Sequence, residues 1–220
     1  MPPLPEGEFL LPLFPLPNLV FFPHTRLPLH VFEPRYRQLV KDVLETDQRL
    51  GIVLLRAGWE GDYFGAPAIH DMATLGVIEQ AVPLEDGRYN MIVRGDVRVR
   101  ILGEVSHAPY RTARVIAEPE IVRDPDAAYA QREWLAEVAR QYLQYLPDPA
   151  AVPEIETVSL EALANALIMS LNLDNEEKQR LLEQNDVIAR AETIGNELAG
   201  RIESLRFLSG YRRSGDPTHN

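Results

Sequence analysis

The side chains that could support catalysis or metal binding are few and scattered along this chain. The sequence has no cysteine, which excludes disulfides, thiolate metal sites and cysteine nucleophiles. Its five histidines lie far apart, at His24, His30, His70, His107 and His219. A histidine metal site needs about three ligands that converge, and this spacing favours ordinary surface or turn histidines instead. We therefore expect no metal site.

The sequence also lacks the motifs of the common enzyme classes. Neither of its two lysines, Lys41 and Lys178, follows a glycine as in a phosphate-binding loop. It contains no glycine-rich dinucleotide motif, no H-E-x-x-H and no G-x-S-x-G. A Ser–Lys dyad would have to use a lysine that we expect on a helix surface. The sequence predicts no catalytic residue, no cofactor and no enzyme; an uncharacterised activity would require histidines and carboxylates to converge in a pocket.

Three large aromatic residues stand in a glycine-rich segment, RAGWEGDYFGAP, at residues 56–67. The glycines and Pro67 predict a loop there. Aromatic side chains in a loop either fold back on the core, which is the more common outcome, or wait for a partner. The second alternative makes Trp59, Tyr63 and Phe64 our candidate peptide-binding residues.

Charged residues form two further candidate features. Glu33, Arg35 and Arg37 lie at an expected strand-to-helix corner, where a pair formed with Glu33 would fix the corner or, less favourably, the cluster would bind a charged group. Six arginines are expected on outward positions of a sheet: Arg88, Arg94, Arg98, Arg100, Arg111 and Arg114. They could form a basic face for RNA, but we favour a solvated face paired with Glu79, Glu85 and Glu104.

Composition sets broad limits on the partners. The chain has 220 residues, 45% of them hydrophobic and 25% charged, as in ordinary globular proteins. Its net charge is −11, which argues against nonspecific nucleic-acid binding. Residues 1–123 hold 13 Lys/Arg and 16 Asp/Glu, a net of −3, whereas residues 124–220 hold 9 and 17, a net of −8. No signal peptide and no membrane-spanning run is visible, so we expect a cytoplasmic protein without a membrane partner.

The stretch around which the fold is organised runs from Leu11 to Arg37 and is apolar but broken by six prolines. Proline fixes φ and removes a backbone donor, so this pattern predicts short extended pieces joined by bends, including a buried strand over 19–22. A helix should follow Pro34. Further strands are expected over 50–55, 75–82, 88–94, 97–101 and 110–117, with turns at Asp86-Gly87 and Gly95-Asp96. Together they predict a small, mostly antiparallel barrel over residues 9–120.

Helical periodicity begins at Asp124-Pro125 and continues nearly to the end of the chain. The first helix should end at Leu146-Pro147, followed by a stiff connector over 147–156. Ser159 and Asp174 are expected to cap the next two helices. The last helix should begin near Asp186, with an apolar stripe from Val187 to Leu205, and residues 210–220 are expected to form a disordered tail.

The opening segment resembles the substrate-recognition domain of the Lon protease family. LPLFPLPNLVFFPHTRLPLHVFEPRYR carries the resemblance, and its PLHVFEPRYR part is most similar to Lon-domain proteins that have no protease of their own. It continues through LGVIEQAVPLEDGRYNMIVRGDVRVRIL and through LANALIMSLNLDNEEKQRLLEQNDVIARAETIGNELAGRI. These three segments, in the family's order, cover nearly the whole chain.

The resemblance implies an α+β fold, in which a PUA-like β pseudo-barrel (residues 1–123) precedes a C-terminal helical bundle (residues 124–209). It also implies recognition of unfolded or tagged polypeptides or of a protein partner, without the ATPase and protease modules of full-length Lon. An adaptor or holdase role linked to proteolysis is therefore our first hypothesis. RNA binding through the arginine face is the alternative, and the oligomeric state stays open.

Overall fold

A computed structural model describes residues 3–145 and 155–214 of the chain. Its contacts divide the chain into two units. The barrel unit comprises Met1–Glu120 and Asn172–Asn185, and the helical unit comprises Ile121–Leu171 and Asp186–Asn220. The order of segments thus differs from a simple succession of barrel and bundle, because one helical segment from the second half groups with the strands.

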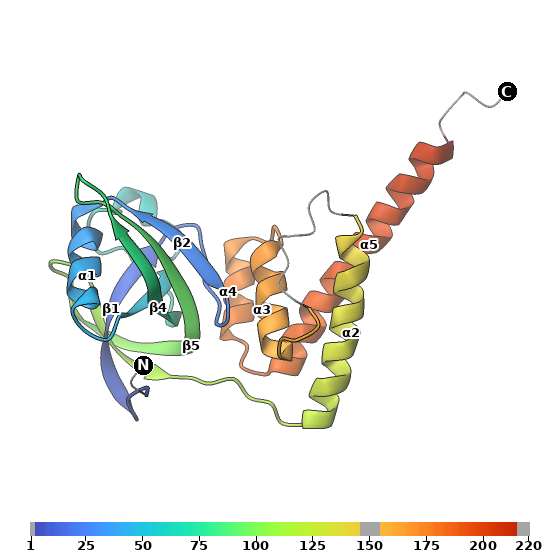
Figure 1. Cartoon of the computed structure of the whole chain (residues 1–220), viewed down its shortest axis with the longest axis horizontal. Helices are drawn as coiled ribbons and strands as arrows, with labels where there is room; N and C mark the ends of the chain where they lie inside the picture. Colours follow the sequence, from blue (N-terminus) through green and yellow to red (C-terminus); the bar gives the residue numbers. More distant parts are fainter. Residues whose placement is uncertain (1–2, 146–154, 215–220) are drawn as a thin grey trace. The chain divides into compact units, whose positions relative to one another are not determined.

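Six strands form one mixed sheet in the barrel unit (Figure 1). They are β1 (Glu8–Leu16), β2 (Arg26–Val31), β3 (Arg49–Leu54), β4 (Met72–Pro83), β5 (Tyr89–Ser106) and β6 (Thr112–Ala117). Pairings run from β6 through β1, β3, β4 and β5 and return to β6, while β2 pairs with the first half of β5. Among these six strands, β1 and β3 pair in parallel and the other pairings are antiparallel. The fold is therefore the expected α+β arrangement with a mostly antiparallel pseudo-barrel.

The barrel interior is filled by alternate side chains of these strands. Leu11, Leu13, Leu75, Val99 and Val115 belong to one buried cluster. Helix α1 (Pro34–Leu44) begins with Pro34, as expected, and buries its apolar stripe. The short helix η1 (Trp59–Gly61) lies in the loop between β3 and β4.

Two sequence-based expectations about the strands are wrong. Residues 19–22 form no strand, although Val20, Phe21 and Phe22 are buried, and β5 runs without a turn through Gly95-Asp96. Both differences have one cause, since the irregular segment after β1 crosses close to β5. His24 N–H donates to the Gly95 carbonyl, and Gly95 N–H donates to the Thr25 carbonyl. A Cβ at position 95 would lie 2.3 Å from the Phe22 carbonyl oxygen, so this glycine permits a close crossing and not a reversal.

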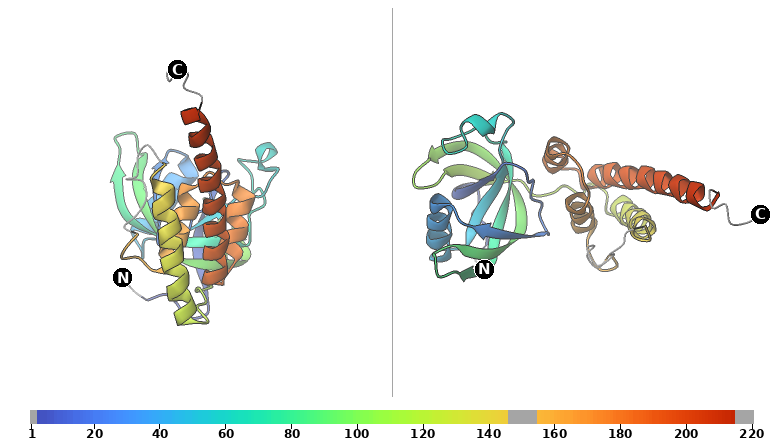
Figure 2. Two further views of the ribbon diagram at one scale, coloured as in Figure 1. Left: turned by 90° about the vertical axis from the view of Figure 1, so that its right-hand side faces the viewer. Right: turned by 90° about the horizontal axis from the view of Figure 1, so that it is seen from above.

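The helical unit contains α2 (Pro125–Leu143), α3 (Leu160–Ser170) and α5 (Val187–Ser214). Helix α2 starts at the expected position, where the Asp124 side chain accepts from two backbone N–H groups, and Ser159 caps α3 as expected. Figure 2 shows α2 and α5 side by side, and these two helices pack together. The expected helix end at Leu146-Pro147 and most of the 147–156 connector lie outside the described residues. Helix α5 includes 210–214, the first part of the expected tail, and 215–220 also lie outside the described residues.

Helix α4 (Asn175–Glu183) packs on the outside of β4 within the barrel unit. Asp174 caps it by accepting from the Glu177 N–H at 2.7 Å, as its sequence indicates. Gln179 donates its side-chain amide to the Met72 carbonyl, and Arg98 donates to the Leu182 carbonyl. These contacts explain why the segment groups with the barrel, which helical periodicity alone could not indicate.

Candidate functional site

The three candidate peptide-binding residues occupy one side of the β3–β4 loop. The rings of Trp59 and Tyr63 meet edge to face at a centroid distance of 5.6 Å, and those of Tyr63 and Phe64 at 5.2 Å. Trp59 and Tyr63 are half-buried and pack against the barrel core, whereas Phe64 is 86% exposed. One loop therefore contains both aromatic side chains that fold back on the core, Trp59 and Tyr63, and one that is exposed, Phe64.

The strand-to-helix corner holds this loop in place. Tyr63 donates its hydroxyl hydrogen to Glu33 Oε1 at 2.6 Å, and Arg35 pairs with the same carboxylate at 3.0 Å. Arg35 also donates to the Tyr63 carbonyl, and its guanidinium lies 4.7 Å from the Tyr36 ring centroid and 5.2 Å from that of Tyr63. Burial, followed by the hydrogen bond to Glu33, raises the pKa of Tyr63, so the phenol stays protonated. The loop and the corner are thus one cluster.

Arg37, the third residue of the expected corner, points elsewhere. Its guanidinium lies against the β4–β5 turn, where a Cβ at Gly87 would fall 2.2 Å from Arg37 Nη2. Its positive charge contributes to lowering the pKa of Asp86 in that turn, after the hydrogen bonds and ion pair with Arg88. The structure brings Glu33 and Arg35 to the aromatic loop and leaves Arg37 out.

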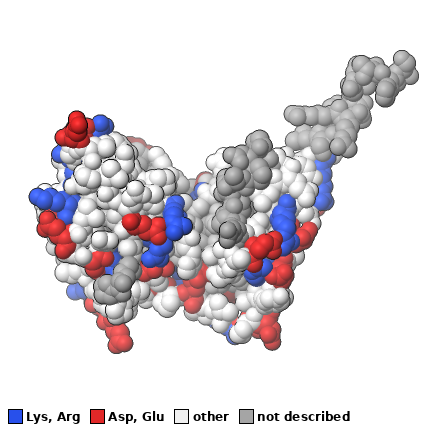
Figure 3. All heavy atoms as spheres, viewed as in Figure 1, with Lys and Arg blue, Asp and Glu red and all other residues white. Residues whose placement is uncertain are grey.

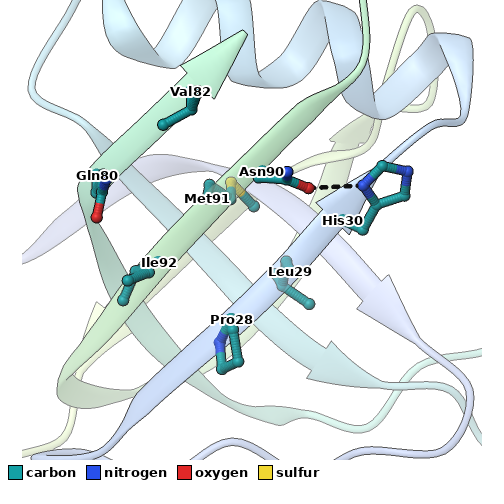
Figure 4. Close-up of a pocket in the computed structure, with 8 residues that line it drawn as sticks. All are labelled: Pro28, Leu29, His30, Gln80, Val82, Asn90, Met91 and Ile92. Carbon is teal, nitrogen blue, oxygen red and sulfur yellow. Dashed lines mark hydrogen bonds between the residues drawn. The ribbon is translucent and has the colours of Figure 1, made fainter. Parts of the chain in front are cut away.

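An apolar groove of about 410 Å³ lies on the outer face of β2, β5 and β4 (Figure 4). Strand β2 contributes Pro28, Leu29 and His30, and the neighbouring strands contribute Gln80, Val82, Asn90, Met91 and Ile92. His30 Nδ1 and Asn90 Oδ1 are 2.7 Å apart at its rim. The groove therefore offers a concave apolar surface with a hydrogen-bonding edge, a form that suits extended peptides.

Sequence reasoning missed this groove, although a signal for it was present. Outward positions of a half-buried strand are normally polar, but Pro28, Ile92 and Val82 occupy outward positions on three adjacent strands. The strand pairing places Pro28 opposite Ile92. Apolar residues on both faces of these strands could have indicated the groove, had the pairing been known.

A series of contacts and neighbouring residues connects the groove to the aromatic loop. The ring of His30 lies 6.3 Å from that of Phe32, which is 60% exposed just after β2. Glu33 follows directly in the chain and accepts the Tyr63 hydrogen bond. The groove, Phe32 and the loop thus lie along consecutive contacts of the barrel unit.

The expected arginine face is not present as a surface. Arg98 is fully buried because α4 covers it, and it donates to the Leu182 carbonyl. Arg111 is nearly buried and donates to the Pro67 carbonyl in the β3–β4 loop. Glu79 pairs with Arg94 and Glu104 with Arg111, as the paired alternative predicted. On the face shown in Figure 3, positive and negative side chains lie next to one another. Among the described residues, these six arginines therefore do not form the continuous basic face that the RNA alternative assumed.

Neither a metal-binding cluster nor a candidate membrane span is found among the described residues. Residues 3–145 and 155–214 contain no group of three or more His, Asp or Glu side chains that could hold a metal ion. No helix in those ranges is long and apolar enough to span a bilayer.

Comparisons with known proteins converge on one family. The family model for the ATP-dependent protease La (LON) substrate-binding domain matches residues 10–199. Lon protease 2 of Myxococcus xanthus is 33% identical over 202 residues, which is 90% of this chain and 24% of that protein. Lon protease of Anaeromyxobacter dehalogenans is 32% identical over 205 residues, with the same coverage. The chain thus spans about a quarter of the length of these relatives.

Two solved structures share the fold. A Lon N-terminal domain protein from Xanthomonas campestris is 25% identical, with a TM-score of 0.62 over 84% of this chain and 96% of its own. The N-terminal domain of a Mycobacterium avium complex Lon protease is 18% identical, with a TM-score of 0.66 over 87% and 98%. The second likeness concerns the fold alone.

Proposed function

Because this chain belongs to the family of LON substrate-binding domains, we propose that it is a non-catalytic module that recognises unfolded or tagged polypeptides. Its role would be that of an adaptor or holdase linked to proteolysis in the cytoplasm. The ATPase and protease activities of the longer relatives form no part of this proposal, since the match covers only about a quarter of their length.

One observation carries the proposal: Phe64 is exposed beside Tyr63, which Glu33 and Arg35 hold through its hydroxyl and its carbonyl. A mobile loop would lose conformational entropy on binding, but Glu33 and Arg35 already hold the backbone and ring of Tyr63 beside it. Burial of one phenylalanine side chain contributes about 2 kcal/mol, or a factor of about 30 in affinity. An anchored aromatic residue is therefore suited to capture apolar segments.

The groove supplies the second contact surface. In this proposal, a polypeptide that places one apolar side chain on Phe64 extends past the exposed Phe32 to the groove. There, Pro28, Ile92 and Val82 would contact further apolar side chains. Recognition of this kind depends on apolar spacing and not on one sequence. That property fits a receptor for unfolded chains.

Binding of fluorescently labelled casein, an unfolded polypeptide, tests the proposal by anisotropy titration. We expect Phe64→Ala to weaken binding at least tenfold and Val82→Asp to weaken it as well. Tyr129→Ala, which removes an exposed aromatic side chain from α2, is the matched control and should change little. Absence of binding by the unaltered protein would refute the function, whereas equal losses in Phe64→Ala and Tyr129→Ala would refute the site.

Suppression of aggregation separates the two finer roles. A holdase should slow the aggregation of a heat-unfolded protein when present at equimolar amounts, and Phe64→Ala should lose this effect. An adaptor should bind without suppressing aggregation, since it passes its cargo on.

A further inference from the structure

A second cavity of the barrel unit is polar and lies apart from the proposed polypeptide surface. It has a volume of about 520 Å³ and is lined by residues around the start of β4 and by α4. None of its lining residues belongs to the aromatic cluster or to the groove. Its volume is in the range of small-molecule sites.

Two buried polar atoms of this cavity have no hydrogen-bond partner among the described residues. His70 is 6% exposed and Gln179 is 2% exposed, yet His70 Nε2 and Gln179 Oε1 are both unsatisfied. The orientation of the Gln179 amide is determined, because its Nε2 donates to the Met72 carbonyl at 3.1 Å and to Glu183 Oε1 at 3.0 Å. Its oxygen therefore remains available as an acceptor. Buried polar atoms are normally bonded, so two such atoms in one cavity point to a ligand.

Acceptor groups gather around these atoms. Glu176 Oε1 lies 3.5 Å from His70 Nε2, and Glu183 Oε1 lies 3.8 Å from His70 Nδ1. Each nitrogen of the imidazole thus has a carboxylate nearby, and the Gln179 amide oxygen lines the same cavity. A group with several N–H donors and a positive charge satisfies this arrangement, and a primary ammonium has three such donors.

Positive charge lines the same cavity. Arg56 pairs with Asp71 at 3.4 Å, and both residues line the cavity. Arg100 also lines it and pairs with Glu118, which does not. Arg180 lines the cavity from α4, and among the described residues its guanidinium has neither an ion pair nor a hydrogen bond. An available guanidinium is a preferred partner for a carboxylate.

We propose that this cavity binds a small zwitterion, namely a free α-amino acid or a short peptide with both ends free. The ammonium would contact Gln179, His70 and Glu176, and the carboxylate would contact Arg180. A simple anion such as phosphate is disfavoured by the two glutamates. A long polypeptide cannot place both of its ends in one cavity of this size, so the site goes beyond the proposed function and does not depend on it.

Isothermal titration calorimetry with four probes tests the proposal: L-alanine, trialanine, N-acetyl-alanine and alanine amide. At least one of the first two should bind with a Kd tighter than about 1 mM. Blocking either end should weaken binding about tenfold, and the ratio between alanine and trialanine identifies the source of the zwitterion. The proposal would be overturned if neither L-alanine nor trialanine bound, or if N-acetyl-alanine and alanine amide bound as tightly as L-alanine.

Glu176 and Arg180 are exposed positions on α4, so substitutions there permit a second test that leaves the fold intact. Glu176→Gln should weaken the free probes about tenfold, and Glu177→Gln, its neighbour outside the cavity lining, should leave them unchanged. Arg180→Gln should weaken alanine but not alanine amide, which has no carboxylate. Unaltered affinity in both Glu176→Gln and Arg180→Gln would refute the site. Casein binding should be normal in all three variants, so that failure of this proposal is distinguishable from failure of polypeptide recognition.

Discussion

Replacement of Arg98 by methionine should destabilise the barrel unit far more than the same change at Arg100, two residues along β5. Arg98 is fully buried, pairs with Glu120 at 2.9 Å and donates to the Leu182 carbonyl at 2.9 Å. Arg100 is half-exposed and pairs with Glu118. Loss of one partner of a buried pair costs about 3–5 kcal/mol, whereas an exposed pair contributes about 0–1 kcal/mol.

The double variant Arg98→Met with Glu120→Leu identifies the origin of this cost. Most of the loss in Arg98→Met should come from the Glu120 carboxylate, which stays buried but no longer has the charge of Arg98 beside it. Removing that carboxylate as well should recover most of the stability, leaving about 1 kcal/mol for the lost bond to the Leu182 carbonyl.

Urea unfolding, followed by circular dichroism and tryptophan fluorescence, measures these differences. Trp134 lies in the helical unit, so a Trp134→Phe background makes Trp59 the reporter of the barrel unit. A loss below about 1 kcal/mol for Arg98→Met, or no recovery in the double variant, would contradict the account of a buried pair that fixes α4.

Three further predictions concern local contacts. Gly95→Ala should lower the free energy of unfolding by about 1–3 kcal/mol, because its Cβ would meet a carbonyl oxygen of the crossing segment. Gly103→Ala on the same strand is the control: its Cβ would meet nothing within 4 Å, so urea unfolding should be nearly unchanged. Burial and a hydrogen bond to Asp42 raise the pKa of Tyr110 to about 12. The protonated Tyr110 phenol should therefore stabilise the fold fully below pH about 10, and this stabilisation should be lost as the pH rises through about 12. Tyr110→Phe should remove this pH dependence from melting curves measured at a series of pH values. Asp124→Ala should lower helical-unit stability by about 0.5–2 kcal/mol, because two N–H groups at the start of α2 lose their acceptor; an unchanged melting temperature would count against this cap.

Much of the fold follows from the sequence because local rules decide it. Pro34, Asp124, Ser159 and Asp174 each mark a helix start that the structure confirms. The turn at Asp86-Gly87 is likewise present, with Gly87 at φ 79°. Such signals act within three or four residues, so no knowledge of tertiary contacts is needed to interpret them.

The errors concern positions whose surroundings come from distant parts of the chain. Alternation placed Arg98 correctly on the outer face of β5, but a face that points away from the barrel interior is exposed only where nothing covers it. Helix α4, 84 residues further along, covers that position. The glycine at position 95 is interpreted as a turn for a similar reason. It is needed because the backbone of residues 22–25 passes close to it, and that approach is not visible in the local sequence.

The candidate site was partly foreseeable for the same reasons. The glycine-rich aromatic loop and the charged corner are visible in the sequence as separate features. Their union through Tyr63 and Glu33 spans 30 residues and depends on how the β3–β4 loop returns to the start of α1. The groove depends on three strands that meet only after folding, so no local pattern reveals it.

The late position of α4 in the chain has a consequence for biosynthesis. A ribosome adds about 5–20 residues per second, so the 84 residues between Arg98 and Leu182 separate their synthesis by about 4–17 s. During that interval the nascent strands expose Arg98 and Glu120 without the helix that covers them, while α2 and α3 emerge and can already fold. Completion of the first unit therefore waits for the synthesis of most of the second, and the nascent chain remains open to chaperones or to premature degradation for several seconds.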